Sequence, residues 1–344
     1  MKVGIVYNPI YLKHDTGTHV ENARRLEAII SCLEQTGLSQ QLTPIKPRAA
    51  SIEELSLVHD KQHISRVESV ANQGGDWLDP DTIVSSDSYE AARYAAGGLI
   101  TATEAVMDGE VSSALALVRP PGHHATARQA MGFCLFNNIA IAAKYALAKY
   151  KLERIGIIDF DVHHGNGTQE AFYDDPRVLY VSTHQYPFYP GTGSVEEIGS
   201  GTAKGTTVNI PLPSGCGDIE YLQSFAQIIV PAVRRFKPQL ILVSAGYDAH
   251  WADGIAFMQV SITGFAQMIR IIKGLADELC GGRLVFTLEG GYNLPALAAS
   301  INATFNILLD NNKTEDLIGP SKYAFGVPDI APLLKSIKEI HNLS

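Results

Sequence analysis

The chain has 344 residues, of which 46% are hydrophobic and 18% are charged, a composition that predicts a globular protein rather than a disordered one. Its net charge of −9 and the lack of a long Lys/Arg run argue against direct nucleic-acid binding. No apolar stretch is long enough for a membrane span, and the N-terminus does not resemble a signal peptide. Four scattered cysteines without a CxxC pair favour a reducing, cytoplasmic location.

Short β-branched runs alternate with longer amphipathic segments along the chain. The expected strands lie at residues 3–7, 114–119, 154–160, 178–183, 240–246 and 284–290. The expected helices lie at residues 22–35, 89–107, 137–150, 219–236 and 262–280. Continuous apolar strands that alternate with helices are typical of a parallel sheet covered on both faces. Because no repeat or linker interrupts this pattern, we expect a single domain over residues 1–344.

Polar, Gly-rich or His-rich sequence follows five of the expected strands. These segments read "PPGHH", "DVHHGNG", "HQYPFYPGTG", "YDAH" and "GYN" in chain order. In open parallel sheets, ligands bind outside the carboxyl ends of the strands. We therefore expect the five segments to meet at one edge of the sheet and to form a site there.

A metal site is the first hypothesis for this edge. In the D-x-H formed by Asp161 and His163, alternate residues of an extended strand exit point the same way. A carboxylate oxygen and an imidazole nitrogen suit Zn²⁺, and Asp248 is the candidate for a third ligand. A salt-bridged loop is the alternative interpretation.

Two adjacent histidines, His123 and His124, follow a rigid Pro-Pro-Gly turn. Beside a metal-bound water, neutral imidazoles can act as general base and general acid. Each needs a partner on its other ring nitrogen, and Asp159 and Asn166 are candidates for this role. A structural histidine pair at a helix start is the alternative.

Aromatic residues lie in the remaining segments. Tyr292, in "LEGGYN", can present a phenol donor to an oxyanion that forms when water attacks a carbonyl. Phe133, Phe188 and Tyr189 can line a narrow channel for an extended aliphatic chain. Ordinary loop packing is the alternative for all four side chains.

With these motifs in place, the sequence resembles the histone deacetylase family, which includes acetylpolyamine amidohydrolases and acetoin-utilisation proteins. The motifs that carry the resemblance are "HDTGTHVENARRL", "RPPGHHA…GFCLFNN", "DFDVHHGNGTQ", "FYPGTG", "SAGYDAH" and "LEGGYN". The resemblance extends from the N-terminus to about residue 310. The implied fold is an arginase-like, three-layer α/β domain with a largely parallel central sheet of about eight strands and helices on both faces.

The resemblance also implies the residues of the catalytic centre. One Zn²⁺ per chain would be bound by Asp161, His163 and Asp248. The catalytic groups would be His124 as general base and then acid, His123 as its electrostatic support, Asp159 and Asn166 as the partners of His123 and His124, and Tyr292 as the group that polarises the acetyl carbonyl. In "HHGNG", His164 is expected to be structural.

Two further sites follow from the resemblance. Phe133 and Tyr189 would flank a tunnel for the acylated amine chain, near the backbone of Gly132. A potassium ion close to the zinc would be bound by Asp159, Asp161, His163, Ser182 and Thr183.

The sequence departs from the family's patterns at informative positions. Asn166 replaces the Asp of class I enzymes, as in the class II branch, and an amide raises the basicity of His124 less than a carboxylate would. Tyr292 stands where some class II enzymes carry His, which favours deacetylase activity. The family's H-P-E-x-P-x-R motif keeps His19, Glu21 and Arg25 but loses both prolines.

The substrate class is indicated by one position. Polyamine-specific relatives carry an acidic residue seven positions after the third zinc ligand, and here that position is Ile255. This favours acetyl-lysine in proteins or peptides, or a small acetylated amine, with an acetylpolyamine amidohydrolase as the alternative. Asp79 or Asp81 could bind the substrate backbone at the rim.

Two rival functions share this fold. An arginase-like ureohydrolase uses two manganese ions and needs a second carboxylate two residues after Asp248, where this chain has His250. A non-catalytic scaffold that binds acyl ligands would not need the full set of ligands, histidines and tyrosine.

Overall fold

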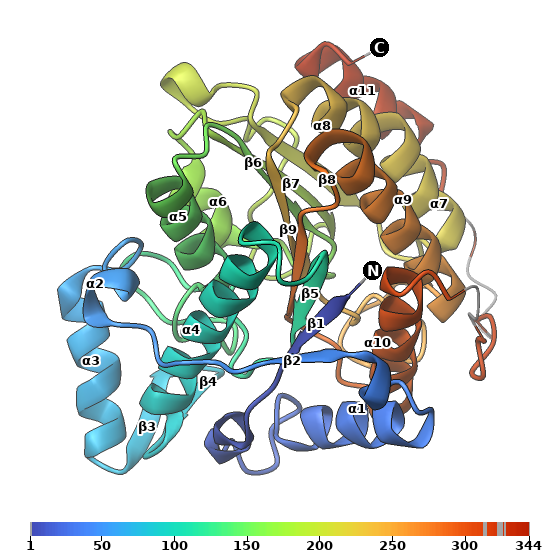
Figure 1. The fold of residues 1–344 in the computed structure, drawn as a ribbon. Coiled ribbons are helices and arrows are strands. Elements are labelled where there is room, and N and C mark those ends of the chain that lie inside the picture. Colours follow the sequence, from blue (N-terminus) through green and yellow to red (C-terminus); the bar gives the residue numbers. More distant parts are fainter. Residues whose placement is uncertain (1, 312–314, 322–325, 327, 344) are drawn as a thin grey trace.

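A central parallel sheet of eight strands organises the computed structural model, which describes residues 2–311, 315–321, 326 and 328–343 (Figure 1). Its strand order is β2-β1-β5-β10-β9-β6-β7-β8, and every neighbouring pair is parallel. The strands are β1 (Val3–Val6), β2 (Thr43–Ile45), β5 (Ser113–Ala116), β6 (Ile155–Asp159), β7 (Val178–Gln185), β8 (Thr207–Leu212), β9 (Leu240–Ala245) and β10 (Leu284–Leu288).

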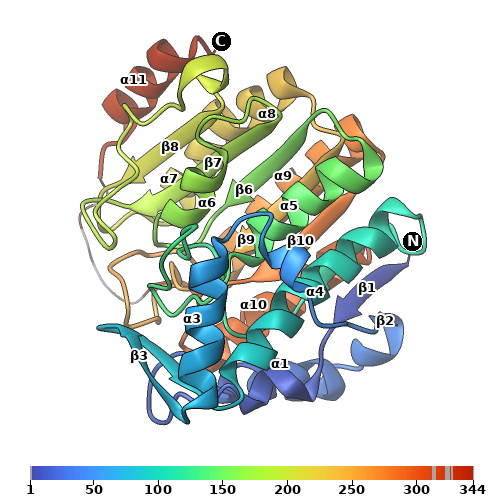
Figure 2. The same cartoon turned by 90° about the vertical axis from the view of Figure 1, so that its left-hand side faces the viewer.

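Helices cover both faces of the sheet (Figures 1 and 2). One layer contains α4 (Ser88–Met107), α5 (Asn138–Tyr150) and α6 (Asn166–Phe172). The other contains α1 (Arg24–Gln35), α7 (Asp218–Ser224), α8 (Val230–Phe236), α9 (Ile262–Cys280), α10 (Leu294–Leu308) and α11 (Ala331–His341). Since both faces are covered, every residue of β6, β7 and β9 is buried, which explains the apolar run with which each of these strands begins. The predicted three-layer fold is confirmed.

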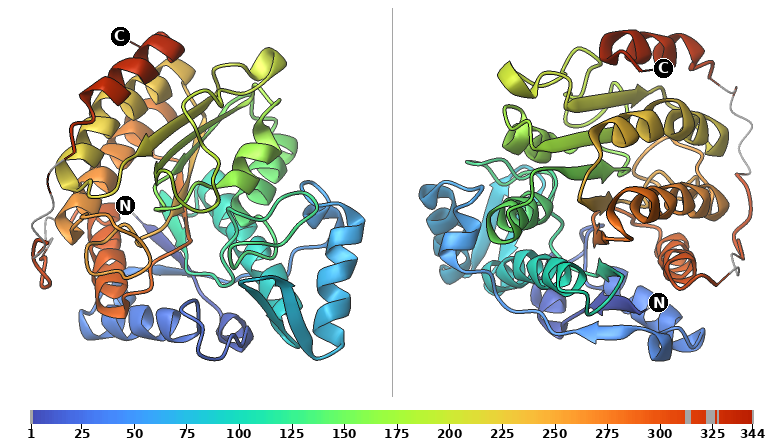
Figure 3. Two further views of the ribbon diagram at one scale, coloured as in Figure 1. Left: turned by 180° about the vertical axis from the view of Figure 1, so that it is seen from behind. Right: turned by 45° about the horizontal axis from the view of Figure 1, so that its top comes forward.

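A small appendage lies beside the main sheet. It comprises α2 (Ile52–Leu55), α3 (Lys61–Asn72) and an antiparallel hairpin of β3 (Gly75–Asp79) and β4 (Thr82–Ser85). The hairpin packs against α3, as the blue and cyan segments of Figure 3 show. The turn of this hairpin carries Asp81, so the appendage contributes to the site described below.

The sequence missed two strands of the sheet and misjudged one helix. β2 and β8 each contain a proline, Pro44 and Pro211, and lack a continuous apolar run, but both pair at the sheet margins. The single helix expected at 219–236 is α7 and α8 joined by a π-helical turn at Phe225–Ile229. Pro231 follows this turn and has no N–H to donate, so the regular α-helical ladder is interrupted there.

Parallel pairing brings the carboxyl ends of β5, β10, β9, β6 and β7 to the same edge. The register sets Thr287 beside Ser244, and Ser244 beside Asp159, across three neighbouring strands. The five polar segments therefore gather at one edge, as predicted. Among the described residues, no helix combines the length and the apolar character that crossing a bilayer requires.

Candidate active site

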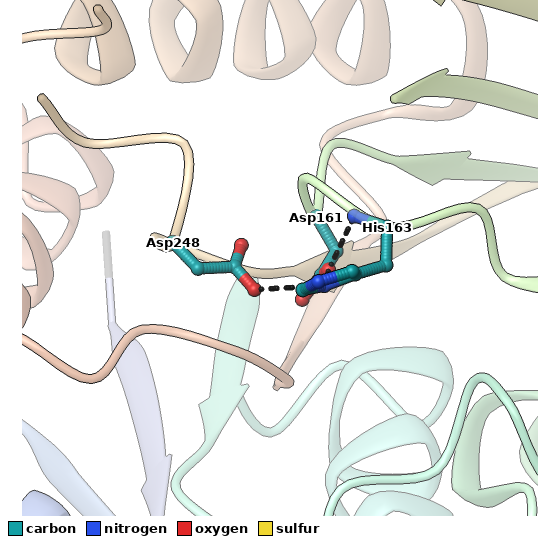
Figure 4. Close-up of side chains that lie close together, drawn as sticks. All are labelled: Asp161, His163 and Asp248. Atoms are coloured by element: carbon teal, nitrogen blue, oxygen red, sulfur yellow. Dashed lines mark hydrogen bonds and ion pairs between the residues drawn. The ribbon is translucent and has the colours of Figure 1, made fainter. Parts of the chain in front are cut away.

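Asp161, His163 and Asp248 form a buried cluster at this edge (Figure 4). Asp161 and His163 lie just after β6, and Asp248 follows the neighbouring strand β9. His163 Nδ1 lies 3.1 Å from Asp161 Oδ1 and 3.3 Å from Asp248 Oδ2. One potential ligand atom from each residue lies within 4.8 Å of the others. The structure thus brings the three predicted metal ligands together.

The cluster has the donor atoms of a zinc site. Asp248 Oδ1 accepts a hydrogen bond from the Val162 N–H at 3.0 Å, whereas Oδ2 faces His163 and has no hydrogen-bond donor among the described residues. Burial, reinforced by the charge of Asp161, raises the pKa of Asp248 to about 6. Two buried carboxylates and an imidazole nitrogen fit a divalent cation, whose charge would offset their repulsion.

Two glycines give the carboxylates room. A Cβ atom at Gly246 would lie 2.0 Å from Asp161 Oδ2, and one at Gly290 would lie 2.0 Å from Asp248 Oδ2. The Gly290 N–H instead donates a hydrogen bond to Asp161 Oδ2 at 2.8 Å. Close approach of the backbone therefore explains why both positions require glycine.

The histidine pair contacts the partners expected from the sequence. His123 Nδ1 lies 3.1 Å from Asp159 Oδ2, and His124 Nδ1 lies 2.8 Å from Asn166 Oδ1. The two ring centroids are 4.0 Å apart. Because Asn166 Nδ2 donates to the His124 carbonyl, its Oδ1 accepts the Nδ1 proton of His124. This arrangement leaves Nε2 of His124 as the basic nitrogen.

The two imidazoles have opposite electrostatic environments. Burial lowers the pKa of His123, but the carboxylates of Asp159 and Asp161 outweigh it and raise the pKa to about 10. Burial, together with the positive charges of His123 and His163, holds the pKa of His124 well below its usual range. At neutral pH the first histidine is therefore protonated and the second is an available base.

These groups open onto a cavity of about 240 Å³. Its lining residues are Asp81, Pro121, His123, His124, Gly132, Phe133, His163, Phe188, Tyr189, Ile255, Gly290 and Tyr292. The Phe188 ring stacks on His163 with a centroid distance of 5.5 Å, and Tyr189 meets His124 edge to face at 5.1 Å. Phe133, Phe188 and Tyr189, the three aromatic residues expected to line a channel, thus lie around one cavity.

Of the five residues proposed for potassium, Asp161 and His163 belong to the metal cluster, and the other three lie where β6 pairs with β7. Asp159 is directly opposite Ser182 in this pairing. The Ser182 hydroxyl contacts His184 Nδ1 at 2.9 Å. The side chain of Thr183, the next residue of β7, points to the opposite face of the strand. The Asp159 carboxylate and the Ser182 hydroxyl are oxygen donors, the kind of ligand that hard cations prefer.

His164 and Asp79 have local contacts. His164 Nδ1 lies 2.7 Å from Thr192 Oγ1, and Nε2 lies 3.0 Å from Gln169 Oε1. With both nitrogens occupied, this histidine is structural, in line with its expected role. Asp79 accepts a hydrogen bond from the Asp81 N–H at 2.9 Å, and of the two only Asp81 lines the cavity.

The sequence analysis gave no role to a buried ionic cluster beside Tyr292. Glu21 contacts the guanidinium groups of both Arg25 and Arg119, and all three side chains are fully buried. Arg25 also donates to the Gly291 carbonyl at 2.7 Å and lies over the Tyr292 ring at 4.9 Å. The partially matching "HVENARR" motif was the available signal, because it contains Glu21 and Arg25.

Glu289 was also missed. Its Oε2 accepts hydrogen bonds from the Gly122 N–H at 2.7 Å and the His123 N–H at 3.3 Å, and its Oε1 contacts Ser244 Oγ at 3.1 Å. Burial raises its pKa to about 7. This carboxylate fastens the histidine loop to the end of β9, a contact that no local sequence pattern indicates.

Known proteins share both the sequence and the fold. The family described as "Histone deacetylase domain" matches residues 19–308. "Histone deacetylase 14, chloroplastic" of Arabidopsis thaliana is 40% identical over 96% of this chain and 83% of its own length. A "Probable deacetylase" of Archaeoglobus fulgidus is 45% identical over 86% of this chain and 82% of its own length. The cytoplasmic location stays a prediction.

A solved structure supports the same assignment. The crystal structure of the HDA15 HD domain superposes with a TM-score of 0.90 and 34% sequence identity, over 99% of this chain and 95% of that one. The sequence match covers most of the chain, and the structural match covers nearly all of it. The chain therefore belongs to the histone deacetylase family.

Proposed function

We propose that this deacetylase is a zinc-dependent amidohydrolase that hydrolyses the acetyl amide of acetyl-lysine in proteins or peptides, or of a small acetylated amine. One observation carries the proposal. His124 as a neutral histidine, the phenol of Tyr292 and His163 of the metal-binding cluster border one cavity with aromatic walls, and the carboxylates of Asp161 and Asp248 lie against His163. This is the set of groups that hydrolysis of an amide on an extended aliphatic chain requires.

The metal site would use Asp161, His163 and Asp248. A zinc ion held there would supply Lewis-acid activation of water and of the acyl carbonyl. Asp159, Asp161, His163, Ser182 and Thr183 would bind potassium, and the pairing of Asp159 with Ser182 across β6 and β7 supports this second site. Metal analysis of the purified protein distinguishes zinc from iron at the catalytic position.

The chain's own residues would move the protons. Nε2 of His124 takes a proton from the attacking water and later delivers it to the leaving amine nitrogen as the C–N bond breaks. The O–H of Tyr292 donates a hydrogen bond to the acyl oxygen as negative charge develops on it. Protonated His123 adds positive charge beside them. Acetate and the free amine are the products.

The cavity wall bears on the choice of substrate. Ile255 lines the cavity with an apolar side chain, which supports a neutral aliphatic chain such as that of acetyl-lysine. Asp81 is the one lining carboxylate, and it favours a cationic amine. An acetylpolyamine is therefore the second candidate substrate.

The rival functions find less support. The described residues contain one three-residue metal cluster. His250 occupies the position where a ureohydrolase needs its second carboxylate, so a two-manganese site is poorly supported. A non-catalytic scaffold would not require a neutral base and a phenol at the same cavity.

The test is acetate release from zinc-loaded protein with acetyl-lysine peptides, acetylpolyamines and longer acyl-lysines. Tyr292→Phe and His124→Ala are each expected to lower kcat by at least about 100-fold while zinc stays bound, since each removes a group that acts in the transition state. A fully active variant with bound zinc would contradict the assigned role. Two manganese ions per chain would revive the ureohydrolase.

A further inference from the structure

Tyr292 lies in a glycine-rich turn whose backbone alone does not fix the position of the tyrosine. Gly290 and Gly291 precede it, and Gly291 has a φ of +116°, a conformation that glycine adopts freely. After the turn, α10 begins at Leu294. The placement of the phenol therefore depends on contacts that other segments make with this turn.

Asp253 makes such contacts from the loop that follows Asp248. Its Oδ2 accepts hydrogen bonds from the N–H groups of Tyr292 at 2.6 Å and Asn293 at 2.8 Å. Its Oδ1 accepts a hydrogen bond from the N–H of Ile255 at 3.2 Å. Only 5% of Asp253 is exposed, so these bonds are shielded from water. One carboxylate thus joins the tyrosine turn to the cavity wall.

The chemistry of this contact favours a charged acceptor. The two N–H groups that meet Oδ2 precede the first turn of α10, where the helix dipole attracts negative charge. A return bond reinforces the contact, because Asn293 Nδ2 donates to the Ala252 carbonyl at 2.8 Å. Bonds that run both ways between the loop and the turn resist relative sliding of the two segments.

We propose that Asp253 is a positioning residue that holds Tyr292 and Ile255 in one rigid unit, so that the phenol faces the acyl group of a chain lying along the wall. The proposal rests on the catalytic role proposed for Tyr292. Among the described residues, the Asp253 carboxylate accepts its hydrogen bonds from backbone N–H groups, and so it acts through the tyrosine.

A double-mutant cycle tests this idea, using Asp253→Asn, Tyr292→Phe and their combination with an acetyl-lysine peptide at saturation. The amide keeps an acceptor for the turn but loses the charge and the bond to Ile255. We expect Asp253→Asn to lower kcat by roughly 10- to 100-fold, as small misplacements of a catalytic group do. In the Tyr292→Phe background it should lower kcat by less than about twofold, because the displaced group is already absent.

Asp218→Asn is the matched control. Asp218 also accepts a backbone N–H from a distant loop, that of Ser261 at 2.8 Å, but it does not line the cavity. It should change kcat little in either background. Equal losses from Asp253→Asn in both backgrounds would overturn the positioning role and leave the proposed function intact. Wild-type activity in Tyr292→Phe alone would overturn both.

A milder variant covers the case in which Asp253→Asn does not fold. Asn293→Ser keeps a side-chain oxygen at the start of α10, where Asn293 Oδ1 now accepts the Ala296 N–H, but removes the bond to Ala252. Asn293→Ser should lower kcat less than Asp253→Asn does in the wild-type background, and it should change kcat little in the Tyr292→Phe background. A loss that persists undiminished in the Tyr292→Phe background would refute the proposal.

Discussion

Replacing Asn166 by Asp should move the acid limb of the pH–rate profile upward. Asn166 Oδ1 lies 2.8 Å from Nδ1 of His124, so the new carboxylate would stand about 4 Å from the centre of the imidazolium charge. At an effective dielectric constant of about 20, this attraction is roughly 4 kcal/mol, and desolvation of the carboxylate reduces it. Opposite charges at such distances typically shift a pKa by about 1 to 3 units.

The direction of the change follows from the role proposed for His124. The base must be neutral, and burial with two neighbouring positive charges keeps its pKa well below the usual range. The wild-type enzyme therefore keeps its base available at mildly acidic pH. In Asn166→Asp the protonated form is stabilised, so activity should be lost at a higher pH as the pH falls.

The assay is kcat/KM for an acetyl-lysine peptide between pH 5 and pH 9, with bound zinc measured at each end. The acid limb should shift upward by about 1 to 3 pH units. Asn302→Asp, which adds the same charge on α10 away from the cavity, should leave the limb in place. An unchanged limb in Asn166→Asp, with zinc retained, would refute the assignment of His124 as the base or of Asn166 as its partner.

Three further variants probe the wall, the cluster and the buried charges. Ile255→Glu should raise kcat/KM for acetylpolyamines relative to acetyl-lysine peptides, because a carboxylate in the wall attracts the extra ammonium group; an unchanged ratio would show that the wall does not select substrates. Gly290→Ala should lower bound metal per chain, since its Cβ would lie 2.0 Å from Asp248 Oδ2, and full metal occupancy would contradict this. Glu21→Gln should lower the free energy of unfolding by about 3 to 5 kcal/mol at pH 7, measured by urea denaturation, because it leaves two arginines buried without their partner. Burial opposes ionisation of Glu21, but the two arginines hold the pKa of its carboxyl far below the usual 4.5. The contribution of Glu21 to the free energy of unfolding is therefore fully present above pH 4.5 and is lost as the pH falls from there toward the lowered pKa. If Glu21→Gln kept the wild-type dependence of stability on pH, Glu21 would not be the source of that dependence.

The sequence predicted the sheet and the catalytic edge because the same segments encode both. An apolar run such as that of β6 indicates a buried strand, and the polar residues directly after it belong to the edge. Asp161, His163, Asp248 and Tyr292 each follow such a run closely. Their convergence then follows from parallel pairing alone.

The residues that support the site were missed for the opposite reason. Glu289 contacts the histidine loop 167 positions away along the chain, and Asp253 contacts the tyrosine turn 39 positions away. No periodicity or spacing encodes contacts at such separations. β2 and β8 were missed because each carries a proline in a short segment, which reads as a loop until its neighbour in the sheet is known.

The adjacency of β6 and β9 gives the metal cluster a second consequence. Asp161 and His163 belong to one strand end and Asp248 to the other, and the chain between them includes β7, β8, α7 and α8. A bound cation would act as a cross-link that closes this long loop and removes the repulsion between two buried carboxylates. Metal loading and global stability would therefore be linked, and free metal at 100 times its dissociation constant would add about 2.7 kcal/mol to the free energy of unfolding.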